Sequence, residues 1–122
     1  MESDNQVLVI DDGRNIRLTL KRALNNAGYR VQTAASGEIG LQKLREECFS
    51  LVFLDLKLPG MNGLQVLAEM EGLDYSTEVI VMTAYDSKDG EKEAKHLGAV
   101  EYLRKPFDCQ EILKLIEKYV RE

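Results

Sequence analysis

A stretch near the middle of the chain places the strongest limit on its fold. Residues 51–54 are four consecutive apolar residues of strand-forming type, Asp55 follows them directly, and a turn at Pro59 and Gly60 comes next. A short apolar run bounded by turn residues is typical of a strand that is buried on both faces, as in a parallel sheet. Asp55 therefore lies where the chain leaves that strand, at the edge where open α/β sheets bind ligands.

Similar runs recur along the chain and alternate with amphipathic patterns. Besides 51–54, strands are expected at 6–10, 29–34, 78–82 and 100–103. Helices are expected over 14–27, 36–47, 63–70, 87–97 and from Asp108 onward. Short connections between five strand–helix units predict a parallel sheet with right-handed crossovers and helices on both faces. The fold class is thus α/β, a doubly wound five-stranded sheet with five helices.

Three residues are expected to mark helix ends. Gly28 follows the first helical pattern in the position where a residue with positive φ ends many helices. Ser36 and Asp108 precede the second and the last helical patterns, and both residue types accept hydrogen bonds from the first free N–H groups of a helix.

Length, charge and composition exclude several classes of protein. A chain of 122 residues is expected to form one domain over 1–122. The net charge of -5 argues against direct nucleic-acid binding by this domain. The polar start of the chain and the lack of an apolar run of about 18 residues predict a cytoplasmic protein with no membrane partner. Cys48 and Cys109 match no metal-ligand spacing and are expected to be buried or half-buried free thiols.

Polar residues follow four of the expected strands. They are Asp11 and Asp12, Asp55, Thr83 and Lys105. Because the carboxyl ends of parallel strands share one edge, these side chains are expected to meet. Three neighbouring carboxylates repel one another, and a divalent cation such as Mg²⁺, which prefers oxygen ligands, relieves that repulsion. With a lysine and a threonine hydroxyl beside it, the group suits a phosphoryl transfer in which Asp55 is the nucleophile.

Each residue of this group also has a purely structural explanation. Asp11 and Asp12 could cap the following helix, Asp55 could be a turn residue, and Thr83 and Lys105 could be an ordinary strand residue and a surface lysine. Helix capping does not explain a lysine and a threonine at the same edge, so the joint explanation is favoured. His96, the single histidine, is expected at the surface of its charged helix.

From about Gln6 to the C-terminus, the chain resembles the receiver domains of bacterial two-component response regulators. The matching motifs are VIDD (9–12), LDLKLPGMNG (54–63), MTAY (82–85) and LRKPF (103–107). The resemblance implies a flavodoxin-like fold with strand order 2-1-3-4-5. It also implies that a sensor histidine kinase or a phosphotransfer protein phosphorylates Asp55 from its phosphohistidine.

The resemblance assigns the metal ligands and the phosphate contacts. Asp12, Asp55 and the main-chain carbonyl of Lys57 would bind Mg²⁺, with Asp11 close by. Lys105 would pair with the phosphoryl group, and the Lys105–Pro106 peptide would be cis.

The resemblance also implies a switch. Thr83 and the amide of Ala84 would hydrogen-bond the phosphoryl group, and movement of Thr83 would let Tyr102 swing in behind it. The helix at 87–97 has few apolar anchors, so the face that it forms with the strand of Tyr102 and the last helix is expected to be the output surface. Permanent packing of Tyr102 in the core is an equal alternative.

Four positions near the expected site could make it differ from the sites of other receiver domains. Asn62 stands where the family often has Asp, and Gly13 stands where a longer polar residue is common. Gly13 leaves the mouth of the metal site more open, so metal affinity is expected to be affected before chemistry. Lys57 and Tyr85 would flank the phosphoryl group, restrict the attacking water and so modulate the lifetime of the phosphate.

The function that follows is a phosphoacceptor switch that assists its own phosphorylation and dephosphorylation, not an enzyme. An aspartyl-phosphate phosphatase is the alternative, but Lys57 stands where such enzymes carry a second Asp. A receiver that only binds partners is a third reading, against which the intact Asp12, Asp55, Thr83 and Lys105 argue. The motifs are similar both to receivers fused to ATPase transcription activators and to stand-alone phosphorelay intermediates. The downstream target, phosphorylation-dependent dimerisation and the extent of the full protein stay open.

Overall fold

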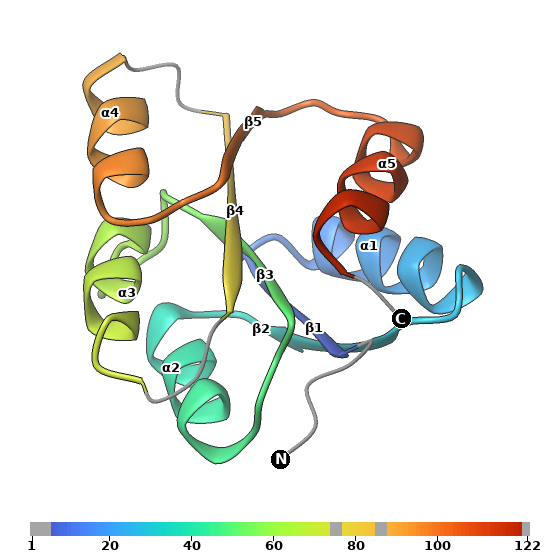
Figure 1. Cartoon of the computed structure of the whole chain (residues 1–122), viewed down its shortest axis with the longest axis horizontal. Helices are drawn as coiled ribbons and strands as arrows, with labels where there is room; N and C mark the ends of the chain where they lie inside the picture. Colours follow the sequence, from blue (N-terminus) through green and yellow to red (C-terminus); the bar gives the residue numbers. More distant parts are fainter. Residues whose placement is uncertain (1–5, 74–76, 85–87, 121–122) are drawn as a thin grey trace.

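Strands and helices alternate along the whole of the described chain (Figure 1). The computed structural model describes residues 6–73, 77–84 and 88–120. The strands are β1 (Gln6–Ile10), β2 (Arg30–Ala34), β3 (Leu51–Asp55), β4 (Glu78–Thr83) and β5 (Glu101–Arg104). The helices are α1 (Arg14–Asn26), α2 (Gly37–Glu46), α3 (Gly63–Met70), α4 (Lys88–His96) and α5 (Cys109–Tyr119).

All strand pairs in the sheet are parallel, and the strand order is β2-β1-β3-β4-β5. Ile10 pairs with Leu54 and Asp55 pairs with Met82, so β1, β3 and β4 end almost level with one another. Thr83 pairs with Arg104, the residue before Lys105. The predicted fold class and strand order are confirmed, and the residues after the strands share one edge.

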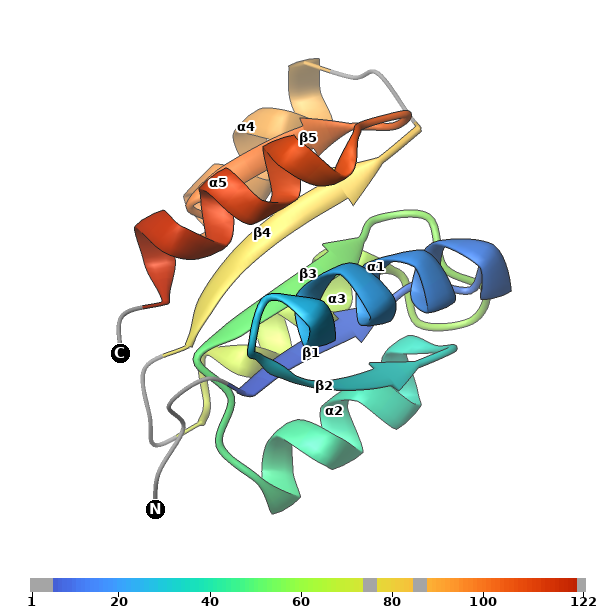
Figure 2. The ribbon, with the colours of Figure 1, turned by 90° about the vertical axis from the view of Figure 1, so that its right-hand side faces the viewer.

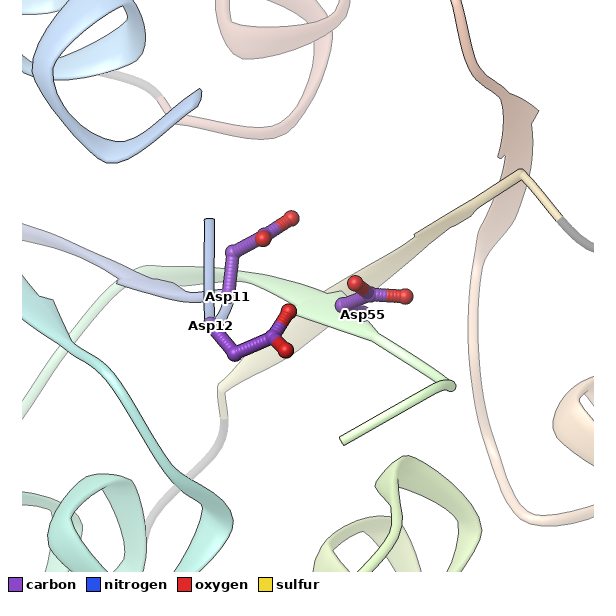
Figure 3. A group of neighbouring side chains, drawn as sticks. All are labelled: Asp11, Asp12 and Asp55. Carbon is purple, nitrogen blue, oxygen red and sulfur yellow. The ribbon is translucent and has the colours of Figure 1, made fainter. Parts of the chain in front are cut away.

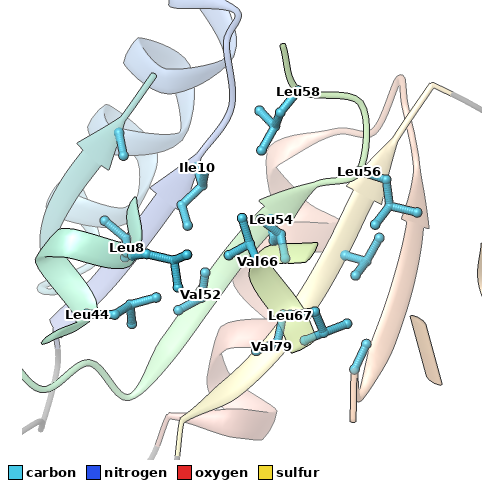
Figure 4. Packing of buried hydrophobic residues seen from close by; sticks show 14 of the residues in the cluster. Leu8, Ile10, Leu44, Val52, Leu54, Leu56, Leu58, Val66, Leu67 and Val79 are labelled. Carbon is cyan, nitrogen blue, oxygen red and sulfur yellow. The ribbon is translucent and has the colours of Figure 1, made fainter. Parts of the chain in front are cut away.

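The sheet separates two hydrophobic cores, because alternate residues of each strand point to opposite faces. Helices α1 and α5 cover one face and α2, α3 and α4 cover the other (Figures 1 and 2). On β1, Val7 and Val9 pack in the first core, and Leu8 and Ile10 pack in the second. All four side chains are fully buried (Figure 4 shows the second core). This two-sided burial explains why the strands are continuous apolar runs.

Side chains cap three of the four helix amino ends whose N-cap residue is described. The Ser36 hydroxyl accepts a hydrogen bond from the Ile39 N–H at 3.2 Å, as predicted. Asp108 caps α5 and Asn62 caps α3, each in a reciprocal capping box with the residue three positions on. Helix α1 differs, because Gly13 precedes it and no side chain caps it.

Other expectations at this level have mixed outcomes. Gly28 has a φ of 99° directly after α1 and its Ala27 cap, as expected for a left-handed residue. Cys48 is buried, but Cys109 is exposed, so the expectation of two buried or half-buried thiols was wrong for Cys109. Cys109 begins α5 on its solvent side, whereas the core-facing residues of that helix are Ile112 and Ile116. Across the described residues, every helix is too short or too polar to cross a membrane.

Candidate functional site

Three carboxylates gather at the carboxyl edge of the sheet (Figure 3). Asp11 and Asp12 follow β1 and Asp55 ends β3, and each offers an oxygen within 4.8 Å of the others. The Asp12 side chain extends toward Asp55 in the view of Figure 3. Asp11 is 1% exposed and Asp55 4% exposed, whereas Asp12 is exposed to solvent. Two buried carboxylates this close together require a compensating cation.

Lys105 supplies part of that compensation. Its Nζ donates to Asp11 Oδ2 at 2.7 Å and to Asp55 Oδ2 at 3.0 Å, and its side chain is only 17% exposed. The Lys105 N–H donates to the Thr83 carbonyl at 2.9 Å, which ties the residue to the end of β4. The peptide between Lys105 and Pro106 is cis, as predicted.

Burial governs the ionisation of Asp55. Desolvation raises the pKa of its carboxyl group above the ordinary value. Hydrogen bonds from Lys105 and from the Lys57 N–H act in the opposite direction without overcoming it. Burial also acts to lower the pKa of Lys105, but its hydrogen bonds to Asp11 and Asp55 outweigh burial and the pKa is raised. Lys105 thus pairs with two of the three carboxylates, Asp11 and Asp55, and the group still favours a further cation beside Asp12.

The loop after β3 is folded back onto the end of that strand. The Lys57 N–H donates to Asp55 Oδ1 at 3.0 Å, and the Gly63 N–H donates to the Leu56 carbonyl at 3.0 Å. Leu56 and Leu58 are buried and anchor the loop in the core. A Cβ on Gly63 would lie 2.3 Å from the Asp55 carbonyl oxygen, so only glycine allows α3 to start this close to the strand.

An open pocket of about 410 Å³ lies over these groups. It is lined by Asp12, Asp55, Lys57, Ala84 and Lys105. Thr83 is fully buried directly beside it, at the end of β4. Seven of the residues singled out from the sequence, with Asp11 included, are thus in or against one site.

Two of the residues singled out lie elsewhere or cannot be placed. Tyr102 is half-buried on β5 and packs against the core formed with α2, α3 and α4, so it does not line the pocket. Tyr85 lies outside the described residues. His96 is exposed at the end of α4, as expected.

The sequence reasoning missed Arg17. Its Nη1 donates to the main-chain carbonyl of Asp11 at 2.8 Å, and the side chain is half-buried. A detectable signal was present, because Arg14 and Arg17 are cations at the start of a helix that has no acidic residue in its first turn. Helix macrodipoles disfavour cations at that end.

The residues present fit a hard divalent cation such as Mg²⁺. Carboxylate and carbonyl oxygens are the donors that this ion prefers. Within the described residues, the Asp12 carboxylate has no hydrogen-bond partner, although it faces the buried Asp55. Asp12, Asp55 and the Lys57 carbonyl could hold such an ion, with Asp11 engaged by Lys105 beside it.

Comparison with known proteins agrees with this geometry. Residues 7–117 match the family model of the response regulator receiver domain. The chain is 39% identical to sporulation initiation phosphotransferase F of Bacillus subtilis over 96% of its own length and 94% of the relative's. It is 37% identical to the transcriptional regulatory protein ZraR of Escherichia coli over 97% of its own length, but it spans only 27% of that regulator.

Solved structures agree as well. A CheY-like receiver domain protein from Methanospirillum hungatei superposes with a TM-score of 0.92 at 31% identity, over 97% of this chain and 94% of the other. A response regulator from Burkholderia pseudomallei was solved with a phosphorylated aspartic acid, a calcium ion and citrate. It superposes with a TM-score of 0.86 at 31% identity, over 97% of this chain and 67% of the other. The chain belongs to the response regulator receiver domain family, whose members are phosphoacceptor switches of two-component systems.

Proposed function

We propose that this chain, over residues 1–122, is a Mg²⁺-dependent receiver whose phosphoryl acceptor is Asp55. The observation that carries the proposal is the position of Asp55, which is buried at the end of β3, bonded to Lys105 and opposite Asp12. The donor is the phosphohistidine of a sensor kinase or of a phosphotransfer protein. The phosphorylated aspartic acid in the Burkholderia pseudomallei relative supports this assignment.

The metal would be held by Asp12, Asp55 and the Lys57 carbonyl, with Asp11 nearby. Bound Mg²⁺ supplies charge neutralisation for the phosphoryl oxygens. Asp11 contributes differently, because its carboxylate already accepts hydrogen bonds from Lys105 and from the Gly13 N–H at 2.7 Å. It therefore acts mainly as the counter-ion that keeps Lys105 at the rim of the pocket.

In the transfer, an Asp55 carboxylate oxygen forms a bond to phosphorus while the bond from phosphorus to the donor's nitrogen breaks. Lys105 exchanges its contact with Asp55 for one with a phosphoryl oxygen, which keeps its charge compensated. The Thr83 hydroxyl and the Ala84 N–H provide further hydrogen bonds to the phosphoryl group. Water later hydrolyses the acyl phosphate, and no metabolite is turned over.

The switch follows from the new charge. Thr83 moves toward the phosphoryl group, and the change is transmitted through Tyr102 to the face formed by α4, β5 and α5. Tyr102 packed permanently in the core is the competing account. That face is the output surface, toward a fused output domain or a separate target protein. The relatives include a phosphotransferase and a transcriptional regulator, which supports either arrangement.

The proposal is tested with acetyl phosphate or beryllofluoride in the presence of Mg²⁺. Wild-type protein is expected to gain one phosphoryl group by mass spectrometry, and chelation of Mg²⁺ is expected to prevent it. Asp55→Asn is expected to take up none while remaining folded. Uptake by this variant, or none by folded wild-type protein, would overturn the assignment. Sustained release of phosphate from an aryl phosphate would favour the phosphatase alternative.

Lys57 and Tyr85 are proposed to prolong the phosphorylated state by restricting the attacking water. Lys57 is exposed at the pocket rim, where its side chain can cover the entrance. Lys57→Ala and Tyr85→Ala are each expected to shorten the phosphate half-life several-fold. Decay at the wild-type rate in both variants would remove this role.

A further inference from the structure

Helix α1 begins in a way that simple helix chemistry disfavours. Arg14 and Arg17 occupy its first and fourth positions, its first turn has no acidic residue, and no side chain caps it. A cation near the amino end of a helix is opposed by the macrodipole. Residues that disfavour the local structure are expected where they serve a functional site.

The contacts of Arg17 indicate that task. Its Nη1 donates to the Asp11 carbonyl oxygen at 2.8 Å, and that carbonyl belongs to the peptide that joins Asp11 to Asp12. Because a peptide unit is planar, holding its oxygen also fixes the direction in which the chain enters Asp12.

The two aspartates differ in how they are held. Asp11 is anchored by its N–H to the Ala34 carbonyl at 3.1 Å, and its carboxylate accepts from Gly13 and Lys105. Asp12 has an exposed side chain with no hydrogen-bond partner among the described residues. The direction of the Asp12 carboxylate thus depends on its backbone, and Arg17 holds the peptide that sets that backbone.

We infer that Arg17 is a positioning residue, which holds the Asp11–Asp12 peptide so that the Asp12 carboxylate faces Asp55 and is preorganised for a divalent cation. The inference rests on the proposed Mg²⁺-dependent function and assigns to Arg17 no contact with the metal or the phosphoryl group. Partners that orient metal ligands typically change metal affinity by about 10- to 100-fold when they are removed.

Two effects of removing Arg17 oppose each other, and this makes the inference testable. Loss of a positive charge near the site would by itself tighten the binding of a cation. Loss of the orienting hydrogen bond would weaken binding. Weaker binding therefore identifies positioning, because the change in charge alone acts in the other direction.

The experiment is an NMR titration of the folded, unphosphorylated protein with Mg²⁺. Arg17→Met keeps much of the side-chain stem and removes the charge and the donor. Its Mg²⁺ dissociation constant is expected to rise about 10-fold. Arg22→Met is the matched control, since Arg22 is an exposed arginine of the same helix, and its constant is expected to stay within about 2-fold of wild type. An unchanged or lower constant in Arg17→Met would overturn the inference.

A double-mutant comparison with Asp12 distinguishes positioning by Arg17 from a role of Arg17 in stability alone. In an Asp12→Asn background, Arg17→Met is expected to change the dissociation constant by less than about 2-fold, because the oriented carboxylate is already absent. The full change in that background would contradict the inference. Arg17→Lys retains the charge without the planar fork and is expected to bind Mg²⁺ more weakly than wild type. Wild-type affinity in Arg17→Lys would contradict the requirement for the guanidinium group in holding the Asp11 carbonyl.

Failure of the inference and failure of the proposed function give different results. If wild-type protein binds Mg²⁺ and accepts a phosphoryl group but Arg17→Met binds equally well, only the inference fails. If wild-type protein binds no Mg²⁺, the proposed function fails. Amide relaxation of Asp12 and Gly13 without metal then decides the orienting role by itself, with greater mobility expected in Arg17→Met than in Arg22→Met.

Discussion

Asp55 carries a negative charge in a place where burial opposes it. Its pKa is raised chiefly by desolvation, and the hydrogen bonds from Lys105 and Lys57 compensate only in part. Burial of this carboxylate lowers the stability of the fold and holds the proposed phosphoryl acceptor at a strand end, and such perturbed groups are common at functional sites. The metal-free domain is therefore less stable than its core would allow.

Asp55→Asn is expected to raise the free energy of unfolding by about 1 kcal/mol at pH 7 without Mg²⁺. The folded-state pKa of Asp55 is raised, so the cost of ionising it is fully present above that pKa. The cost shrinks as the pH falls through the raised folded-state pKa and is lost below the ordinary value of 3.8, where the carboxyl becomes protonated in both states. Urea titrations from pH 7 to pH 4 measure the difference in the free energy of unfolding between variant and wild type, which should narrow as the pH falls. Asp89→Asn, at an exposed residue, controls for net charge, and a lower stability of Asp55→Asn than of wild type at pH 7 would contradict the expectation.

At the level of single residues, sequence reasoning identified the acidic group and Lys105 because they follow strands. It could not predict that Lys105 bonds both Asp11 and Asp55, since this depends on how far a flexible side chain reaches across the edge. Arg17 was missed because its partner is a main-chain carbonyl, which has no signature of its own. The exposure of Cys109 was missed because the expectation followed the usual burial of free cysteines, although its neighbours Asp108, Gln110 and Glu111 are polar.

The β3–α3 connection is the element most sensitive to a single added carbon. A Cβ at position 63 would lie 2.3 Å from the Asp55 carbonyl oxygen and 2.6 Å from the Leu56 Cα, both backbone atoms that cannot rotate away. The start of α3 and the end of β3 are thus in direct contact.

Gly63→Ala is expected to lower the free energy of unfolding by about 1–3 kcal/mol, the usual cost of overpacking. It is also expected to weaken Mg²⁺ binding, because the loop that carries Lys57 must shift. Chemical denaturation and a metal titration check both effects. Gly72→Ala is the control, since its Cβ would meet only the Glu69 carbonyl at 3.7 Å. Equal stability of the two alanine variants would refute the steric account.

A second connection ties β5 to α5, far from the pocket. The Tyr119 hydroxyl donates to Glu101 Oε2 at 2.6 Å, and Lys118 lies 3.3 Å from the same oxygen. The Tyr119 hydrogen bond is the main reason that the pKa of Glu101 is lowered. This tie fixes the strand that carries Tyr102 to the last helix.

Glu101→Gln is expected to lower the free energy of unfolding by about 1 kcal/mol at pH 7, because a neutral acceptor forms a weaker hydrogen bond. The contribution of Glu101 is fully present above its ordinary value of 4.5 and is lost as the pH falls through its lower folded-state pKa. The difference between wild type and variant should therefore close below pH 4.5, as thermal unfolding can measure. In a Tyr119→Phe background the substitution should cost less, and an undiminished cost would contradict the role of the hydroxyl.

At the scale of the whole molecule, α4 buries the fewest residues of the described helices. Its single fully buried residue is Ala94, whereas α1 buries Leu20 and Leu24 and α5 buries Ile112 and Ile116. Helices with little buried apolar area open at low free energy. The low burial of α4 supports the proposal that this helix takes part in the response to phosphorylation, which stays a prediction.

Hydrogen exchange is expected to rank the elements by this burial. Amides of α4 should exchange faster than those of the other described helices, and amides of β1 and β3 should exchange slowest because both strands are fully buried. Exchange mass spectrometry or NMR on the unphosphorylated protein measures the order. Slower exchange in α4 than in α1 would contradict the proposed mobility.

The general fold was predictable from the apolar runs and from the turn and helix-capping residues between them. Continuous burial of residues 6–10 and 51–55 requires helices on both sides, and Ser36 and Asp108 mark where two of those helices begin. The order of the strands came only from the family resemblance. Hydrophobic periodicity cannot distinguish one neighbour from another, because every inner strand presents similar apolar faces to the sheet.

All five residues that line the pocket come from strand ends and connecting loops, and none comes from the described helices. After gene duplication, the surfaces of the helices can therefore change to fit new partners while the pocket at the carboxyl edge of the sheet keeps its residues. Arg17 is the exception, since one helix residue reaches back to that edge. Paralogues that retarget α1 would need to preserve this arginine while altering the residues around it.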